Sequence, residues 1–496
     1  MSFISIQDDR FIDASGRHLL LHGINLVNKD PADGYIGDEE PADFAAWRSW
    51  GLNCVRLGVI WDGLEPEPGI YNEKYLQAID RQIAWAAEND LFVILDMHQD
   101  LYSVLYADGA PAWATLINGQ PHLSESGVWS DAYFTSPAVH AAWDNFWDNA
   151  PAPDGVGLQD HYAKLWAVIA RRYAGNPMVA GYDLMNEPMP GSPALQGQLL
   201  MLSAGAERLA QGGGENEPDV TELAEQWLTP GGRSYILNLL RDIALYGPVA
   251  DAPEGLYAEF ERENLMPFYR RVAAAIRSVD QNHIIFTGTT MGSNLGMRSH
   301  IEPLAVSGQR DALQAYAPHG YDLVTDTADV ANASPERFEF IFRRHGETAA
   351  RLRMPVLVGE WGAYDRHPGT LVPAQHVIRQ FEQMLFSETY WTYLPETEHI
   401  PCFQAISRPY PVSVSGRLLR YHYEPFDGSF SCVWLEDPAI DAPSIVYLPE
   451  WFSFDSQALQ LDPVSDVSPQ SSGSGCYLKI TPTGTTATRQ LTIKQN

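Results

Sequence analysis

The chain has 496 residues, of which 45% are hydrophobic and 19% charged, and it contains 14 Trp, 23 Tyr and 19 Phe. This composition excludes a disordered, collagen-like or low-complexity chain and indicates a globular protein rich in aromatic residues. The 32 Lys and Arg residues face 63 Asp and Glu residues, so the net charge of −31 repels phosphates and anionic lipid headgroups. We therefore expect no nucleic-acid partner.

Cysteine spacing and the N-terminus bear on the cell compartment. The four cysteines, Cys54, Cys402, Cys432 and Cys476, form no CxxC pair, so we expect neither a disulfide framework nor a zinc site. The first residues, MSFISIQDDRFIDASG, lack the basic and apolar regions of a signal peptide, and no stretch is apolar enough to span a membrane. These features predict a cytoplasmic protein without stable membrane insertion, or a secreted one if a leader was removed.

Short apolar runs alternate with amphipathic helical patterns along most of the chain. The runs read as buried strands that end in polar residues. In chain order they span residues 18–26, 53–59, 91–98, 179–188, 283–290, 313–322, 354–362 and 389–394. Eight strand–helix alternations predict an α/β fold, a (β/α)₈ TIM barrel over residues 1–407. A doubly wound sheet is disfavoured because no GxGxxG turn follows an early strand.

Two insertions and a change of pattern complete the predicted organisation. The insertions, at residues 101–160 and 189–253, follow strands 3 and 4, at the ends where barrel enzymes build their sites. Within the second insertion, GGGENEP and PGGRS have the composition of loops. Residues 408–496 alternate apolar and polar residues between Gly, Pro and Ser clusters. They predict a small C-terminal antiparallel β-sandwich, either a structural cap or a carbohydrate- or lipid-binding module.

Polar side chains at the predicted strand ends are the most informative feature of the sequence. In a barrel such side chains face the mouth and converge. They are Arg56, His98, Asn186, Glu187, His319, Tyr321, Glu360 and Trp391. Glu187 and Glu360 end otherwise apolar strands, where an unpaired buried carboxylate would be costly. Two apposed carboxylates with separated pKa values suit glycoside hydrolysis, although a pair of salt-bridged structural glutamates is the alternative.

An ordered set of motifs runs through these strand ends: Asn186-Glu187-Pro188, His319-x-Tyr321, Glu360 and Trp391. The set resembles the clan of retaining (β/α)₈ glycosidases that includes the cellulase-like glycoside hydrolase family five. The runs GINLVNKD, DMHQDLYS, DNFWDN and RPYP are similar, more narrowly, to its endoglycoceramidase and glucosylceramidase branch. The resemblance covers most of the chain, but neither the segment around residues 211–247 nor the C-terminal half of the last domain.

The resemblance implies a role for each matching residue. Glu187 would be the acid/base and Glu360 the nucleophile. Arg56 and Tyr321 would lie near the nucleophile, and Asn186 at the sugar 2-hydroxyl. The other candidates for substrate binding are Lys29, His98, Asp100, Trp147, His319 and Trp391, the last as a stacking platform beneath the sugar ring. For several of these a structural role is the alternative: a solvated lysine, a core histidine, a turn aspartate and a core tryptophan.

The implied reaction is a double displacement. Glu360 would attack the anomeric carbon while Glu187 protonates the aglycone oxygen, and water would then hydrolyse the glycosyl-enzyme with retention at a β-linkage. The two carboxyl groups should then lie about 5–5.5 Å apart. No metal or organic cofactor is predicted, since the sequence shows no ligand spacing for one. No protein partner is predicted either.

The insertions bear on the substrate. Their aromatic and aliphatic side chains favour a glycolipid presented in micelles or membranes, such as glucosylceramide, a steryl glucoside or an oligosaccharyl ceramide. Endo-β-glucanase-like hydrolysis of polysaccharides is the enzymatic alternative. A noncatalytic glycolipid-binding barrel is the third hypothesis.

Overall fold

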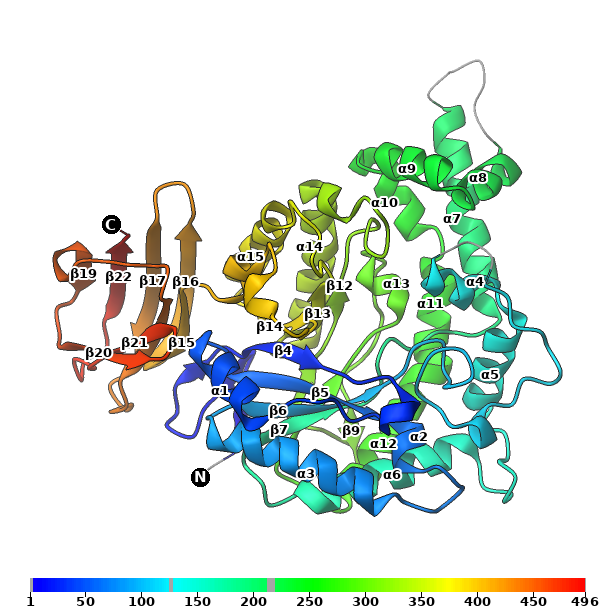
Figure 1. The fold of residues 1–496 in the computed structure, drawn as a ribbon, viewed down its shortest axis with the longest axis horizontal. Coiled ribbons are helices and arrows are strands. Elements are labelled where there is room, and N and C mark those ends of the chain that lie inside the picture. Colours follow the sequence, from blue (N-terminus) through cyan, green and yellow to red (C-terminus); the bar gives the residue numbers. More distant parts are fainter. Residues whose placement is uncertain (1–2, 125–127, 212–218, 496) are drawn as a thin grey trace.

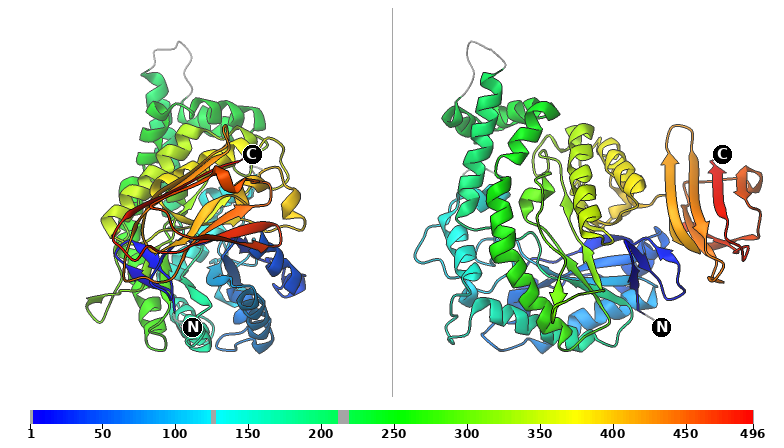
Figure 2. Two further views of the ribbon diagram at one scale, coloured as in Figure 1. Left: turned by 90° about the vertical axis from the view of Figure 1, so that its left-hand side faces the viewer. Right: turned by 180° about the vertical axis from the view of Figure 1, so that it is seen from behind.

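The computed structural model describes residues 3–124, 128–211 and 219–495. Figure 1 shows a barrel surrounded by helices, with a separate group of antiparallel strands at one end and long helical insertions at the other. Both insertions lie on the side at which the barrel strands end, away from the C-terminal strands (Figures 1 and 2).

Nine parallel strands of the described chain form the barrel sheet, in the order β11-β8-β7-β6-β5-β4-β14-β13-β12. They are β4 (His22–Leu26), β5 (Cys54–Ile60), β6 (Phe92–His98), β7 (Val179–Asp183), β8 (Ile284–Thr287), β11 (Gln314–Tyr316), β12 (His319–Gly320), β13 (Leu357–Gly362) and β14 (Ser387–Trp391). β11 pairs with β8 and β12 with β13, so these two are halves of one sixth strand. A parallel bridge from Tyr316 to Val356 completes the closure. The predicted (β/α)₈ barrel is confirmed.

Helices cover the outside of this sheet, which is why its strands read as continuous apolar runs. The barrel helices are α1 (Pro41–Ser49), α2 (Trp61–Leu64), α3 (Glu73–Glu88), α6 (Leu158–Tyr173), α12 (Met266–Arg277), α13 (Met291–Asn294), α14 (Pro335–Leu352), α15 (Leu371–Met384) and α16 (Phe403–Ile406). Asn72 caps α3 by accepting from the amides of Lys74 and Tyr75, and Ser334 caps α14 by accepting from that of Arg337.

The two insertions are largely helical. The first contains η3 (Trp129–Asp131), α4 (Ala132–Thr135) and α5 (Pro137–Trp147), and the second α7 (Pro193–Ala210), α8 (Val220–Trp227), α9 (Pro230–Leu239) and α10 (Ile243–Asp251), followed by α11 (Glu254–Phe260). The interpretation of PGGRS as a loop is wrong, because it begins α9: Pro230 occupies the first turn and the Thr229 hydroxyl accepts from the Gly232 amide. GGGENEP lies outside the described residues.

Two antiparallel sheets make up the strand domain in the described part of the chain. One is β1-β2-β3-β15-β18-β21-β20 and the other β16-β17-β22-β19. Their bounds are β1 (Ser5–Gln7), β2 (Arg10–Ile12), β3 (His18–Leu19), β15 (Tyr410–Val414), β16 (Gly416–Glu424), β17 (Ser429–Glu436), β18 (Ser444–Pro449), β19 (Leu459–Asp462), β20 (Val467–Ser472), β21 (Gly475–Ile480) and β22 (Thr488–Lys494). The predicted C-terminal antiparallel domain is confirmed.

The N-terminal strands contribute to that domain, which the sequence analysis did not anticipate. Residues 18–26 were expected to form one barrel strand, but the structure divides them into β3 and β4. β3 pairs with β15, with Leu19 opposite Ser413, whereas β4 pairs with β5 and β14. The chain therefore crosses from one sheet to the other within three residues, and this crossing ties the two domains together.

A buried ionic cluster lies beside this crossing. Glu388 on β14 contacts His22 on β4, and it accepts from Nη2 of Arg408 at 2.9 Å and from Nε1 of Trp361 at 2.5 Å. Burial opposes ionisation of Glu388, but His22 and Arg408 outweigh it and hold the pKa of Glu388 at about 2. The carboxylate thus links the first and last barrel strands to the segment that leads into the C-terminal domain.

Glu388→Gln should lower the free energy of unfolding by about 3–5 kcal/mol, because it leaves the buried Arg408 guanidinium without its counter-charge. Urea unfolding followed by tryptophan fluorescence measures the change. Glu302→Gln is the control, since Glu302 pairs with Arg270 at the surface and its loss should leave the unfolding midpoint unchanged. Equal midpoints for all three proteins would contradict a structural role for this cluster.

Candidate active site

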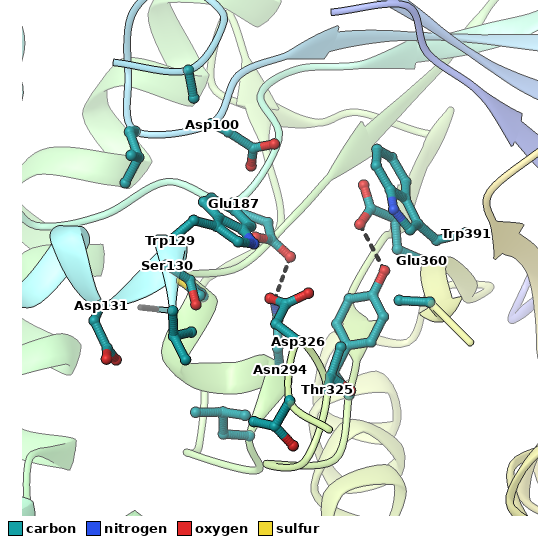
Figure 3. A pocket seen from close by; sticks show the side chains of 18 of the residues that line it. Asp100, Trp129, Ser130, Asp131, Glu187, Asn294, Thr325, Asp326, Glu360 and Trp391 are labelled. Atoms are coloured by element: carbon teal, nitrogen blue, oxygen red, sulfur yellow. Dashed lines mark hydrogen bonds between the residues drawn. The ribbon is translucent and has the colours of Figure 1, made fainter. Parts of the chain in front are cut away.

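A cavity of about 480 Å³ opens where the barrel strands end. Its wall includes eight of the residues that the sequence predicts for the site: Lys29, His98, Asp100, Asn186, Glu187, Tyr321, Glu360 and Trp391. Figure 3 shows Glu187 and Glu360 pointing into this space from different strands. The convergence expected of barrel strand ends is thus present for most of the predicted set.

The backbone holds both glutamates rigidly. Glu360 lies within β13, in register with His319 of β12. Glu187 follows β7 with φ of +40°, in a region that costs a non-glycine residue energy. The side-chain amide of Gln99 donates to the backbone carbonyl oxygens of Asn186 and Glu187 at 2.8 and 3.2 Å. These hydrogen bonds fix the strained turn.

The two carboxylates and an imidazole form a compact group. One oxygen of Glu187, one oxygen of Glu360 and a ring nitrogen of His319 all lie within 4.8 Å of one another. Nδ1 of His319 is 2.9 Å from Oε1 of Glu187 and 3.5 Å from Oε2 of Glu360. Burial lowers the pKa of His319 to about 4, so near neutral pH the ring is uncharged and Nδ1–H can donate to Glu187. The approach of one oxygen of each carboxylate to within 4.8 Å is compatible with the close carboxyl pair of retaining glycosidases.

Arg56 fixes the position of Glu360. This fully buried side chain donates from Nη1 to Glu360 Oε1 at 2.8 Å, and from Nη2 to Asn186 Oδ1 at 3.0 Å. Tyr321 donates its hydroxyl to the other oxygen, Oε2, of Glu360 at 2.9 Å, as the dashed line in Figure 3 marks. Two donors therefore hold the Glu360 carboxylate in one orientation.

Glu187 has a contrasting environment. Its Oε1 accepts from the side-chain amide of Asn294 at 2.6 Å, and among the described residues no guanidinium or ammonium group forms a hydrogen bond or ion pair with it. Burial, aided by the negative charge of Asp100, raises the pKa of Glu187 to about 7. A glutamate that keeps its proton to about pH 7, beside a second glutamate that two donors orient, is an arrangement that suits an acid and a nucleophile.

Lys29, His98 and Asp100 form a charged group on another wall of the cavity. Lys29 contacts Asp100 and lies 4.7 Å from the ring centre of Trp391, and the His98 ring stacks on the same indole at 5.1 Å. His98 Nδ1 is 2.7 Å from Asp96 Oδ2. Burial opposes the charged forms of His98 and Asp100. Asp96 and Asp100 nevertheless raise the pKa of His98 to about 10. Lys29 and His98 lower the pKa of Asp100 to about 2.

The sequence analysis missed several cavity residues. Asn294, Asp108, Asp326 and Trp129 line the space but do not end a predicted strand. Asp108 lies 3.7 Å from Lys29, and burial together with Asp100 raises its pKa to about 7. Burial, aided by the negative charges of Asp100 and Glu187, raises the pKa of Asp326 to about 6. Only their position on insertions and loops after strand ends could have suggested them.

Trp147 requires a correction. It lies outside the cavity, in an aromatic cluster in which its ring stacks on Trp143 at 5.4 Å and packs edge-on against Phe260 and Phe268. Its Nε1 donates to the carbonyl of Met189 at 2.8 Å. Trp147 thus joins the two insertions as a core residue and does not line the cavity. Arg56 and His319 also lie behind the cavity wall and act through the glutamates.

Two groups of described residues bring three potential metal ligands within 4.8 Å of one another: His98–Asp100–Asp108 and Glu187–His319–Glu360. Lys29 already occupies the first group, and Arg56, Asn294 and Tyr321 already bond the carboxylates of the second. We therefore assign neither group to a metal.

Comparison with known proteins identifies the family. The family model for cellulase (glycosyl hydrolase family 5) matches residues 12–396, and the model for the glycoside hydrolase family 5 C-terminal domain matches residues 408–494. The chain belongs to glycoside hydrolase family 5. The second match includes the C-terminal half of the strand domain, for which the sequence motifs gave no resemblance.

Individual relatives agree with this family. Endoglycoceramidase I of Rhodococcus hoagii is 35% identical over 183 residues, 36% of this chain and 36% of that protein. Glucosylceramidase of Cryptococcus neoformans is 29% identical over 255 residues, 39% of this chain and 34% of that protein. The structure of endo-glycoceramidase II from Rhodococcus sp. with ganglioside GM3 has a TM-score of 0.74 at 25% identity, covering 99% of this chain and 100% of that one. The aligned regions span about a third of the length of the two curated relatives.

The raised pKa of Glu187 predicts a pH-dependent gain of stability on its neutralisation. The folded protein binds a proton at Glu187 up to about pH 7, whereas an unfolded glutamate releases it near pH 4.5, so the buried charge destabilises the fold increasingly between these values. Glu187→Gln should therefore raise the free energy of unfolding by about 3 kcal/mol at pH 8 and leave it nearly unchanged at pH 4.5.

Urea unfolding at the two pH values measures this difference. Glu339→Gln, at an exposed position of α14, is the control and should show no change at either pH. A stabilisation of Glu187→Gln that is equal at both pH values would contradict the assignment of a raised pKa.

Proposed function

We propose that the protein is a retaining β-glycosidase that hydrolyses the bond between the sugar and the lipid aglycone of glycolipids. The observation that carries the proposal is the pair of unlike carboxylates, Glu187 and Glu360, with oxygens within 4.8 Å across one cavity. This separation suits direct attack by one carboxylate, because inverting enzymes need room for a water molecule between the sugar and the base.

The roles of the two glutamates follow from their environments. Glu360, oriented by Arg56 and Tyr321, attacks the anomeric carbon and forms a glycosyl-enzyme. Glu187, protonated through its burial, donates its proton to the aglycone oxygen as the bond breaks. The carboxylate that remains takes a proton from water, which attacks the anomeric carbon and releases the sugar with retained configuration.

An apolar chamber beside the cavity supports a lipid aglycone. This space of about 150 Å³ is lined almost entirely by apolar side chains of the second insertion and its neighbours, among them Met201, Leu202, Val249, Ala250 and Met297. It shares Asp131, Phe134, Trp227, Leu295 and Leu323 with the catalytic cavity. Leu295 directly follows Asn294, the hydrogen-bond partner of Glu187, so the chamber adjoins the side from which the aglycone is protonated.

The relatives support the same substrate class. The two curated relatives are named for ceramide-linked sugars, and the structural neighbour carries a ganglioside. A polysaccharide offers no group that would gain from an apolar chamber beside the scissile bond, which makes the endo-β-glucanase alternative less favourable. A neutral glycosphingolipid is therefore the substrate class that the site suits best.

Glu360→Gln and Glu187→Gln should each lower the hydrolysis of glucosylceramide in detergent by about 10³-fold or more. In the wild type, kcat/KM should fall as the pH rises through about 7, because Glu187 loses the proton that it donates. Asn294→Leu removes a donor that stabilises the ionised form, so the alkaline limb should move to higher pH. Sugar release measured from pH 5 to 9, with lactosylceramide and a soluble β-glucan as parallel substrates, tests these expectations.

Two results would contradict the assignment. Turnover of the β-glucan alone would show a polysaccharidase, and undiminished activity of both glutamine variants would remove the catalytic role of the pair.

Filling the apolar chamber should separate lipid from non-lipid substrates. Ala250→Phe places a phenyl ring in the chamber and should reduce kcat/KM for long-chain glucosylceramide about tenfold, while hydrolysis of a soluble aryl β-glucoside stays unchanged. Ala439→Phe, at an exposed position of the C-terminal domain, is the control. An equal effect of Ala250→Phe on both substrates would show that the chamber does not receive the aglycone.

A further inference from the structure

Helix α7 exposes an unusual stretch of uncharged surface. From Pro193 to Ala206 the sequence reads PALQGQLLMLSAGA and contains no charged side chain, although 19% of the residues in the whole chain are charged. Soluble helices normally place charged residues on their solvent face. The absence of charge therefore calls for a partner other than water.

Large apolar side chains point to solvent along this stretch. Leu195, Leu199 and Leu200 are 44%, 48% and 37% exposed. Leu195 and Leu199 are four residues apart, which places them on the same side of the helix. We refer to Leu195, Leu199 and Leu200 as the outer face of α7. An exposed group of apolar residues of this kind marks an interaction site.

The opposite side of α7 belongs to the protein interior. Ala194 and Gly197 are buried against the protein, and Gln198, Met201 and Leu202 line the apolar chamber. The same helix thus separates the proposed aglycone chamber from the solvent. Its position is on the side of the barrel at which the strands end, the side opposite the C-terminal domain (Figures 1 and 2).

The chemistry of the outer face selects its partner. No helix among the described residues is long and apolar enough to cross a membrane. A helix that is apolar on one face and anchored to the protein by the other can instead lie in the headgroup region of a lipid layer. The net charge of −31 disfavours an anionic surface, so electrically neutral lipid is the matching partner.

We propose that the outer face of α7 docks the protein on neutral, zwitterionic lipid surfaces and holds the apolar chamber against the layer that contains the substrate. This inference rests on the proposed function, because a lipid aglycone has to leave such a layer to reach Glu187. Docking leaves Leu195 and Leu199 in the headgroup region while Met201 and Leu202 face the chamber, so the aglycone moves between two apolar surfaces of one helix.

The experiment compares three full-length proteins. Leu195→Gln combined with Leu199→Gln makes the outer face polar without placing new side chains in the cavity. The matched control, Leu419→Gln combined with Leu435→Gln, changes two leucines of 45% and 41% exposure in the C-terminal domain. Flotation with phosphatidylcholine vesicles measures docking, and sugar release is followed from glucosylceramide in those vesicles and from a soluble aryl β-glucoside.

Wild type and control should float with the vesicles, and the α7 variant should lose about tenfold in both flotation and vesicle turnover. Its turnover of the soluble glucoside should equal that of the wild type. Equal flotation of all three proteins, or none by the wild type, would overturn the proposal. So would a wild-type dimer that becomes a monomer in the α7 variant, since a second copy would then cover the face.

Failure of the proposed function gives a different pattern. In that case the wild type cleaves no glycolipid in vesicles or detergent, whereas flotation, which requires no catalysis, still reports on α7 directly.

Discussion

The active site depends on a single buried cation. Arg56 on β5 is fully enclosed and lies within 3.0 Å of oxygens on Asp96, Asp183 and Glu360. Removing a guanidinium from water is expensive, and the three carboxylates compensate for that cost only in this arrangement. Since they come from β6, β7 and β13, the electrostatics that make Arg56 tolerable also fix the relative positions of strands across the barrel. The same charges that make the burial of Arg56 tolerable therefore also fix the position of Glu360, the proposed nucleophile.

The two glutamates have different electrostatic environments because Arg56 contacts only one of them, Glu360. Arg56 donates a hydrogen bond to Glu360. The described partners of the Glu187 carboxyl oxygen, Asn294 and His319, are uncharged groups. Burial and the negative charge of Asp100 outweigh the opposing effects of His98, Asn294 and Lys29 and raise the pKa of Glu187 to about 7. His319, itself held neutral by burial, can hydrogen-bond to Glu187 without adding a charge that would ionise it. The placement of Arg56 thus distinguishes the proposed acid, Glu187, from the proposed nucleophile, Glu360.

The barrel and the site residues on its strands could be predicted from the sequence, because a polar side chain at the end of a buried apolar strand faces the mouth of the barrel. The prediction of Glu187 and Glu360 followed from that reason, whereas Arg56 lies inside β5 and not at its end. Strand-end reasoning failed for residues whose position depends on tertiary structure. Asn294 and Asp108 follow no strand directly, and Trp147 lies in an insertion where a core aromatic and a binding aromatic have the same sequence signature. The split of residues 18–26 between β3 and β4 was equally hidden, since both halves are apolar and only their pairing partners differ.

The division between barrel and insertions also divides the chemistry from the choice of substrate. Among the described residues, the groups that bond the two glutamate side chains come from barrel strands, from the turn after β12 and, for Asn294, from the short barrel helix α13, and these groups are charged or polar. The chamber, in contrast, is built mainly by α7, α10 and their neighbours, with hardly a polar atom in its wall. Because an apolar wall cannot stabilise the charge that develops during hydrolysis, its contribution is to bind the part of the substrate that does not react. The chain has a net charge of −31, yet the stretch of α7 from Pro193 to Ala206 carries no charged side chain and lies at the edge of that chamber. The two tasks are thus separated along the path from the lipid surface to the scissile bond.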